Sequence, residues 1–255
     1  MSVIDDFLAK WREYRAPGYY EEFDYHWTMS VDLDRCTGCE ACVTACQAEN
    51  NTPIVGVEAI ARGRHMQWMR IERYWEGEYP DVKLRAIPMF CQQCDAAPCE
   101  TVCPVSATYH NQDGLNAQIY NRCIGTRSCA VYCPYEVRYF NYNNHHWDAP
   151  LDQQLNPDVS IREKGVMEKC TFCIQRIRQA KDAAKDDGRR RVRDGEVQPA
   201  CVQTCPTEAL VFGDRKDPES AISQMLGNER VYRVLEELNT DPSVVYLKKV
   251  DADAG

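Results

Sequence analysis

The sequence lacks the features by which a chain enters or crosses a membrane unaided. No stretch approaches the roughly eighteen consecutive apolar residues of a membrane-spanning helix. Residues 1–15 carry charged side chains where a signal peptide has its apolar core, and no twin-arginine pair stands near the start. We therefore expect no membrane span and no export signal in this chain. Taken alone, this absence predicts a cytoplasmic protein.

Positive charge and known catalytic motifs are also lacking. The 255 residues include 30 lysines and arginines against 39 acidic residues, so the formal net charge is −9. Such a chain repels a phosphate backbone, and no binding to nucleic acid is expected. No nucleophile motif, phosphate-binding loop or dinucleotide fingerprint stands out. We therefore predict no catalytic residue.

Cysteine, in contrast, is abundant, with 15 residues. An odd number cannot all form intrachain disulfides, and disulfide frameworks are typical of much shorter chains. The cysteines stand close together in groups, which indicates metal binding. Group one is Cys36, Cys39, Cys42 and Cys46; group two is Cys91, Cys94, Cys99 and Cys103; group three is Cys123, Cys129 and Cys133; group four is Cys170, Cys173, Cys201 and Cys205.

The spacing within these groups indicates iron–sulfur clusters. Three cysteines close in sequence surround one cluster, and a fourth, usually before a proline, ligates a different cluster. Pro104, Pro134 and Pro206 stand in that place. Thiolates suit the iron of a sulfide cluster because both are soft. Structural zinc is the alternative, but the compact first group does not suit a tetrahedral zinc site.

The third group has one cysteine fewer than the others. Aligned with group one, its second cysteine would stand at position 126, which is Thr126. A hydroxyl is a poor iron ligand beside thiolates, so a 3Fe–4S cluster is predicted here. The alternative is a 4Fe–4S cluster whose fourth iron binds water, hydroxide or Thr126. A 3Fe–4S centre should differ in potential from its neighbours, on the high side, which suits exchange with a quinone pool.

The order of the groups predicts how ligands are shared. Groups two and three form one two-cluster unit, and groups one and four bracket it and form a second. Two-cluster units exchange their fourth ligands. This rule assigns Cys36, Cys39, Cys42 and Cys205 to 4Fe–4S cluster 1; Cys170, Cys173, Cys201 and Cys46 to 4Fe–4S cluster 2; Cys91, Cys94, Cys99 and Cys133 to 4Fe–4S cluster 3; and Cys123, Cys129 and Cys103 to the 3Fe–4S cluster. Arg122, Arg127 and Lys169 are expected to offset the negative charge of the clusters.

The predicted fold is α+β, with short strands and helices around two pseudo-symmetric ferredoxin-like two-cluster units. We expect an N-terminal helical arm over 1–28, for docking or for packing on its own domain, and a four-cluster domain over 29–215. Unit A comprises 29–90 and 165–215, unit B comprises 91–145, and a C-terminal helix and strand extension covers 216–255. Strands are expected over 27–33, 66–75, 83–87, 117–120, 136–142, 209–213 and 243–250, and helices over 171–187 and over 219–238, the latter interrupted around Gly227.

These motifs resemble the four-cluster iron–sulfur subunits of membrane oxidoreductases of the DMSO reductase, polysulfide reductase and nitrate reductase family. The resemblance covers roughly residues 29–215 and rests on all four cysteine groups with the prolines that follow them. The run Cys123-Ile-Gly-Thr-Arg-Ser-Cys129, with Arg138-Tyr-Phe-Asn141 after it, is most similar to the iron–sulfur subunits of menaquinone reductase and to the iron–sulfur domain of alternative complex III.

The resemblance implies an electron-transfer subunit that is itself not catalytic. Electrons would pass between a molybdopterin-type subunit or multihaem cytochrome c at cluster 1 and a quinone-binding integral membrane subunit at the 3Fe–4S cluster, for menaquinone reduction. The chain would be a peripheral membrane subunit on the periplasmic face, exported together with a partner. The alternatives are a subunit of a true molybdenum reductase or dehydrogenase, and a soluble polyferredoxin-like carrier.

Overall fold

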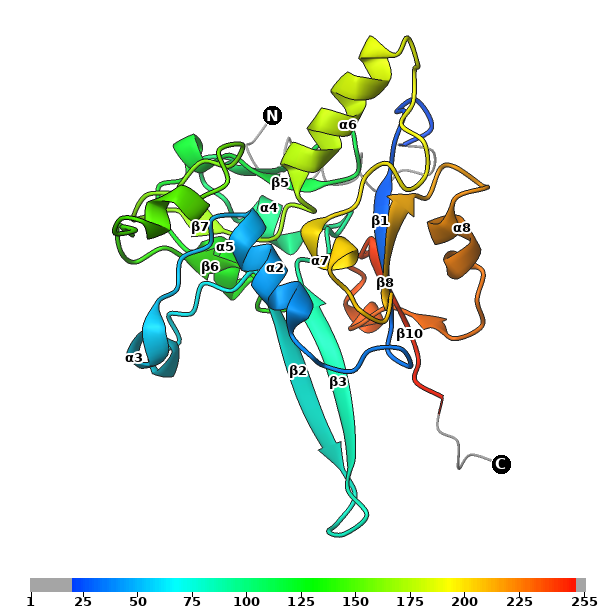
Figure 1. Cartoon of the computed structure of the whole chain (residues 1–255), viewed down its shortest axis with the longest axis horizontal. Helices are drawn as coiled ribbons and strands as arrows, with labels where there is room; N and C mark the ends of the chain where they lie inside the picture. Colours follow the sequence, from blue (N-terminus) through cyan, green and yellow to red (C-terminus); the bar gives the residue numbers. More distant parts are fainter. Residues whose placement is uncertain (1–19, 251–255) are drawn as a thin grey trace, which may run out of the picture.

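The computed structural model describes residues 20–250, so residues 1–19 of the predicted N-terminal helical arm lie outside the described residues; residues 20–26 form turns and irregular chain, and β1 begins at Trp27. Short helices and strands alternate along this part of the chain (Figure 1). The α-helices are α2 (Ala41–Glu49), α3 (Gly56–Ala61), α4 (Pro98–Thr101), α5 (Ser128–Val131), α6 (Ile174–Asp186), α7 (Ala200–Gln203) and α8 (Ala221–Leu226). The strands are β1 (Trp27–Asp32), β2 (Met69–Glu76), β3 (Lys83–Phe90), β4 (Thr108–His110), β5 (Asn116–Gln118), β6 (Tyr139–Phe140), β7 (Met167–Glu168), β8 (Leu210–Asp214), β9 (Val231–Tyr232) and β10 (Val244–Leu247). Short 3-10 helices are η1 (Tyr120–Arg122), η2 (Leu151–Gln154) and η3 (Glu236–Leu238). The predicted α+β class is confirmed, and none of these helices has the length and apolar character of a membrane span.

The largest sheet joins the two ends of the described chain. Its strands lie in the order β8-β1-β10-β9. β1 runs antiparallel to β8 and parallel to β10, so that Met29 lies opposite Phe212 on one side and Val244 on the other. Every residue of β1 is buried, because the faces and edges of this central strand are all covered. The segment after residue 216 thus supplies two strands of the main sheet.

Two predicted elements differ from the structure. Within 219–238 only α8 is an α-helix; β9 follows it, and Leu235 and Asn239 have left-handed φ angles of 53° and 52°. Pairing of β9 with β10 outweighs the helical periodicity of this segment, because tertiary contacts override local propensity. The strand predicted over 136–142 is shorter than expected, since only β6 pairs with β7.

β2 and β3 form the hairpin that the sequence predicts between 66 and 87, and this hairpin projects from the body (Figure 1). The strands pair antiparallel along their whole length. β3 continues through Pro88, where it was expected to end. Both strands are edges of a two-stranded ribbon, so the missing N–H of Pro88 deprives no further strand of a partner.

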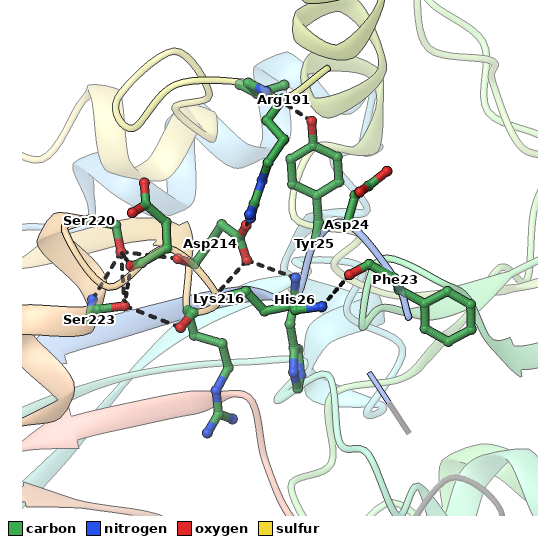
Figure 2. A network of polar contacts seen from close by, with 12 residues as sticks. Phe23, Asp24, Tyr25, His26, Arg191, Asp214, Lys216, Ser220 and Ser223 are labelled. Atoms are coloured by element: carbon green, nitrogen blue, oxygen red, sulfur yellow. Dashed lines mark hydrogen bonds and ion pairs between the residues drawn. The ribbon is translucent and has the colours of Figure 1, made fainter. Parts of the chain in front are cut away.

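Asp214, at the end of β8, fastens three distant segments to one another (Figure 2). Its Oδ1 accepts hydrogen bonds from the backbone N–H groups of His26 at 2.9 Å and Lys216 at 3.0 Å. Arg191, from the loop after α6, forms an ion pair with the same carboxylate. The Ser220 hydroxyl donates to the Asp214 carbonyl at 3.0 Å. The start of β1, the arginine-rich loop (residues 189–193) and the segment after β8 are therefore held together.

Candidate metal centres

The fifteen cysteines are all free thiols, and they lie within short helices or in the loops on either side of them. The third ligand position of each group, counting Thr126 as the second in group three, lies on such a helix: Cys42 on α2, Cys99 on α4, Cys129 on α5 and Cys201 on α7. α2 packs against α7, and α4 packs against α5. The same pairing of helices thus occurs twice, which is the pseudo-symmetry predicted from the order of the groups.

The loops also share one backbone feature. The residue before the second ligand position has a positive φ each time: 68° at Gly38, 49° at Gln93, 72° at Gly125 and 54° at Phe172. A left-handed residue turns successive N–H groups toward one side and forms a concave site for an anionic group. Gly125 needs to be glycine for a second reason, because a Cβ there would collide with the Gly165 carbonyl oxygen.

Thr126 stands in the loop where the other groups have their second cysteine. The residues on either side of Thr126 have φ angles of 72° and 63°, and those beside Cys39 have 68° and 63°. The two loops therefore follow the same course. Both side chains are exposed. The matching backbone of the two loops agrees with the alignment that places Thr126 opposite Cys39.

The fold places cysteines from different groups together. Set 1 is Cys36, Cys39, Cys42 and Cys205, which line one small cavity. Burial raises the pKa of Cys36, and the nearby charges of Cys205 and Cys39 add to that rise. Burial and the charges of Cys36 and Cys205 raise the pKa of Cys42 to about 12. These thiols come from opposite ends of the segment that carries the cysteines, as the predicted exchange of ligands would require.

Two further sets are deeply buried. Set 2 is Cys46, Cys170, Cys173 and Cys201, and set 3 is Cys91, Cys94, Cys99 and Cys133. Burial raises the pKa of Cys46 well above its ordinary value, and the charges of the other members of set 2 raise it further. Burial and the charges of its set act on Cys94 in the same way. Such thiols would stay protonated unless bound metal stabilised their charge.

Set 4 is the predicted trio Cys103, Cys123 and Cys129. Cys123 and Cys129 pack in one apolar cluster of side chains. Cys103 lies just after α4, which packs against the helix α5 that carries Cys129. The backbone N–H of Met167 donates to Cys123 Sγ at 3.3 Å. These contacts place the three cysteines on neighbouring elements.

Two of the cysteines that precede a proline accept a backbone hydrogen bond at sulfur. The N–H of Ala107 donates to Cys103 Sγ at 3.2 Å, and that of Ala209 donates to Cys205 Sγ at 3.3 Å. Burial acts to raise the pKa of Cys205, but this bond and those from Thr207 outweigh it and lower the pKa. N–H donors of this kind favour the thiolate that an iron–sulfur cluster requires.

Neighbouring sets lie close to one another. Burial and the charges of Cys173 and Cys170, in its own set, raise the pKa of Cys201. The charge of Cys42 in set 1 raises this pKa further. Burial and the charge of Cys91 in set 3 raise the pKa of Cys170 in set 2 to about 12. Packing agrees: Cys42 and Cys201 share one apolar cluster, and Cys170 packs against the cluster that contains set 3, so set 2 lies between sets 1 and 3.

Arg138 joins set 3 to set 4 and was not predicted as a site residue. Its buried guanidinium donates to Cys99 Sγ at 3.2 Å and to Thr108 Oγ1 at 2.6 Å. Burial acts to lower the pKa of Arg138, but the charges of Cys99 and then Cys129 outweigh it and raise the pKa. The sets thus follow one another in the order 1, 2, 3, 4. No spacing rule marks Arg138, because the residue reaches this sulfur from another part of the fold.

The predicted cations have different surroundings. Lys169 is fully buried beside set 2, and its Nζ donates to the Cys170 carbonyl at 3.0 Å. Arg122 and Arg127 are exposed, and the Arg127 guanidinium lies over the Phe140 ring, 5.2 Å from its centroid. Of the three, Lys169 is the one buried against a cysteine.

The donor set fits iron–sulfur clusters. Asn50, also not predicted, places its Nδ2 at 3.7 Å from Cys46 Sγ and 3.8 Å from Cys173 Sγ. Soft thiols, N–H donors and buried cations are what an anionic cluster requires. Within residues 20–250, no three cysteine, histidine or carboxylate side chains converge on a single metal-ion position. A cluster needs no such convergence, since each of its thiolates binds a different iron.

A ferredoxin-like α+β fold with repeated, paired cysteine loops defines an iron–sulfur protein. Family comparisons agree with this class. Residues 27–48 match the 4Fe-4S binding domain, and residues 82–149 match the 4Fe-4S dicluster domain. The chain therefore binds iron–sulfur clusters of the 4Fe–4S type.

Curated relatives match most of the chain. The iron–sulfur cluster-binding subunit of menaquinone reductase from Nitratidesulfovibrio vulgaris is 42% identical, over 90% of this chain and 91% of the relative. Iron–sulfur subunit 1 of the Hdr-like menaquinol oxidoreductase from Archaeoglobus fulgidus is 37% identical, over 87% and 83%. The putative iron–sulfur subunit of dimethyl sulfoxide reductase from Halobacterium salinarum is 35% identical, over 86% and 78%. The chain belongs to this family of iron–sulfur subunits of multi-subunit reductases, as the cysteine motifs predicted.

Proposed function

We propose that this chain carries electrons along three 4Fe–4S clusters and one 3Fe–4S cluster, held by sets 1 to 4 in that order. The observation that carries the proposal is the succession of the sets: Cys42 of set 1 and Cys201 of set 2 pack in one apolar cluster, and Cys170 of set 2 packs against the cluster that contains the cysteines of set 3. Centres in such a row pass single electrons without any movement of the chain. The chain then needs no catalytic residue and works as the electron-transfer subunit of a larger reductase.

The protein's own residues hold the clusters, exclude water and adjust their potentials. The clusters, when bound, supply reversible one-electron chemistry. Arg138 and Lys169 place buried positive charge beside sets 3 and 2, and Asn50 aims an N–H donor at two sulfurs of set 2. Each favours the reduced state of the nearby cluster, because reduction adds negative charge.

Set 4 is proposed to hold the 3Fe–4S cluster, because Thr126 stands where a fourth ligand would be. A high potential in this centre suits electron transfer to a quinone. Ile124, Val131 and Tyr132 near this set are exposed. Apolar side chains on this surface suit contact with a quinone-binding membrane subunit.

Two relatives are named for menaquinone or menaquinol, which favours menaquinone reduction by the complex to which this chain belongs. A molybdopterin-type subunit or a multihaem cytochrome c would supply electrons at set 1. The chain would lie on the periplasmic face after export with a partner. Protease added to spheroplasts should then degrade it, and a chain protected until lysis would contradict that location.

The test of the cluster assignment is electron paramagnetic resonance on anaerobically purified protein, with iron measured in the same samples. We expect a near-isotropic 3Fe–4S signal in the oxidised protein, interacting 4Fe–4S signals after reduction, and about fifteen irons per chain, three fours and a three. About sixteen irons without an oxidised signal would show a fourth cubane instead and contradict the role given to Thr126.

A further inference from the structure

The hairpin of β2 and β3 has two chemically different faces. Side chains alternate between the faces of a strand, and residues opposite each other in an antiparallel pair share a face. The register therefore places one group of side chains together. This face carries Ile71, Arg73 and Trp75 from β2 and Pro88, Ala86 and Leu84 from β3. Apart from Arg73, it is apolar.

The opposite face is charged and bonded within itself. Arg70 forms an ion pair with Glu72 at 2.6 Å, and the Tyr74 hydroxyl donates to the same carboxylate at 2.6 Å. Arg85 pairs with Glu76 at 2.9 Å. Such a face is stable in contact with water. The hairpin is thus amphipathic, although it projects from the body (Figure 1).

The apolar face begins at the cysteine loop of set 1. Ile71 and Pro88, at the base of the hairpin, line the cavity of set 1. A Cβ on Gly38 would lie 2.9 Å from the Ala86 Cβ, so the loop and the ribbon are in close contact. Cys39, in the same loop, is the one exposed cysteine thiol among the described residues. The apolar face and the exposed end of set 1 therefore form one continuous surface.

The outer half of this face is uncovered. Trp75 is 68% exposed and lies opposite Leu84, which is 38% exposed. Tyr79, at the tip, is 93% exposed. A two-stranded ribbon is at best marginally stable alone in water, and exposed aromatic side chains on such a ribbon mark an interface.

We propose that the apolar face of the hairpin and the exposed loop of set 1 together dock a second redox protein, which exchanges electrons with set 1. The partner would present an apolar contact surrounded by lysine and arginine side chains. This inference rests on the proposed function, because it requires a cluster in set 1.

Charge selects this partner over other occupants. Glu78 and Asp81 at the tip are exposed, and a cluster with four thiolates adds about two more negative charges, whereas Glu208 beside the cysteine loop is balanced by Arg35 at 3.9 Å. This surface attracts a basic protein by complementarity. It repels an anionic membrane and a second copy of this chain, which carries the same acidic residues. The exposed Cys39 loop gives the partner's redox centre access to set 1.

Neighbouring aromatic residues on opposite faces provide the test. A benzophenone side chain is introduced at Trp75, on the apolar face, or at Tyr74, on the charged face, in the complex isolated from its native membrane. Light should cross-link position 75, but not position 74, to a subunit that contains haem, iron–sulfur or molybdenum. Cross-linking to lipid, to a second copy or to a chain without a redox centre would overturn the proposal. So would equal cross-linking from both positions, or none from position 75.

Electron transfer provides a second readout. In the complex, Trp75→Ser should slow reduction of the clusters by the redox partner about thirtyfold at limiting partner concentration, the effect of removing an aromatic anchor from an interface. Tyr74→Ser should leave this rate unchanged, and a small viologen dye should reduce both variants at the normal rate. Equal partner rates in the two variants would refute the docking surface. Absence of any cluster signal after dye reduction would instead refute the proposed function.

Discussion

Replacement of Arg138 by glutamine is expected to lower the reduction potential of the cluster in set 3. The guanidinium is buried and donates to Cys99 Sγ at 3.2 Å, so its positive charge acts on the added electron with little screening. With roughly 5 Å between the charges and an effective dielectric constant of about 20, Coulomb's law gives about 3 kcal/mol. For a one-electron couple, about 59 mV corresponds to 1.4 kcal/mol, so the potential should fall by about 130 mV.

The assay is a redox titration followed by electron paramagnetic resonance, with iron content measured to show that the cluster remains bound. Arg138→Lys keeps the positive charge and should shift the potential much less. Arg190→Gln serves as a control, because that exposed arginine pairs with Asp24 at 2.7 Å on the surface. An unchanged potential in a cluster-replete Arg138→Gln protein would refute the electrostatic role given to this residue.

Three further outcomes are expected. Thr126→Cys should convert the 3Fe–4S centre to 4Fe–4S, so that iron rises from about fifteen to about sixteen atoms per chain and the oxidised resonance signal disappears; persistence of that signal would contradict the assignment. Asn50→Leu removes the N–H donor beside Cys46, and a loss of about 1 kcal/mol should lower the potential of the set 2 cluster by about 40 mV in the same titration. Arg176 lowers the pKa of Glu49 below its ordinary value of 4.5, so the stability from this pair is present above pH 4.5 and is lost as the pH falls through the lowered pKa. Glu49→Gln should make denaturant-induced unfolding less dependent on pH in that range, and an identical pH dependence in both proteins would argue against this contribution.

The cysteine loops could be predicted from sequence because their chemistry is local. Each loop needs closely spaced thiols and a residue of positive φ before the second ligand position, as at Gly38 and Gly125. The position of Thr126 follows from spacing alone, and the backbone repeat agrees with it. The hairpin could be predicted for a similar reason, since two short strands joined by a turn form from neighbouring residues.

Long-range pairing could not be predicted in this way. β10 pairs with β1, and β9 pairs with β10, although the periodicity of 219–238 favours a helix. Arg138 and Asn50 approach sulfur only after distant segments have packed. The ion pairs of the arginine-rich loop show the same limit: Arg190 with Asp24 and Arg191 with Asp214 join residues far apart in the sequence, so no local pattern indicates them.

The parallel pairing of β1 with β10 has a consequence for biosynthesis. Met29 leaves the ribosome long before Val244, the residue that it lies opposite in the finished sheet. Cys36 and Cys39, just after β1, likewise wait for Cys205, whereas all four thiols of set 3 emerge within one short segment. Under the proposed cluster assignment, set 3 could therefore receive its cluster while translation continues. Set 1 would be completed late in synthesis, so its thiols would stay without their cluster for longer than those of set 3.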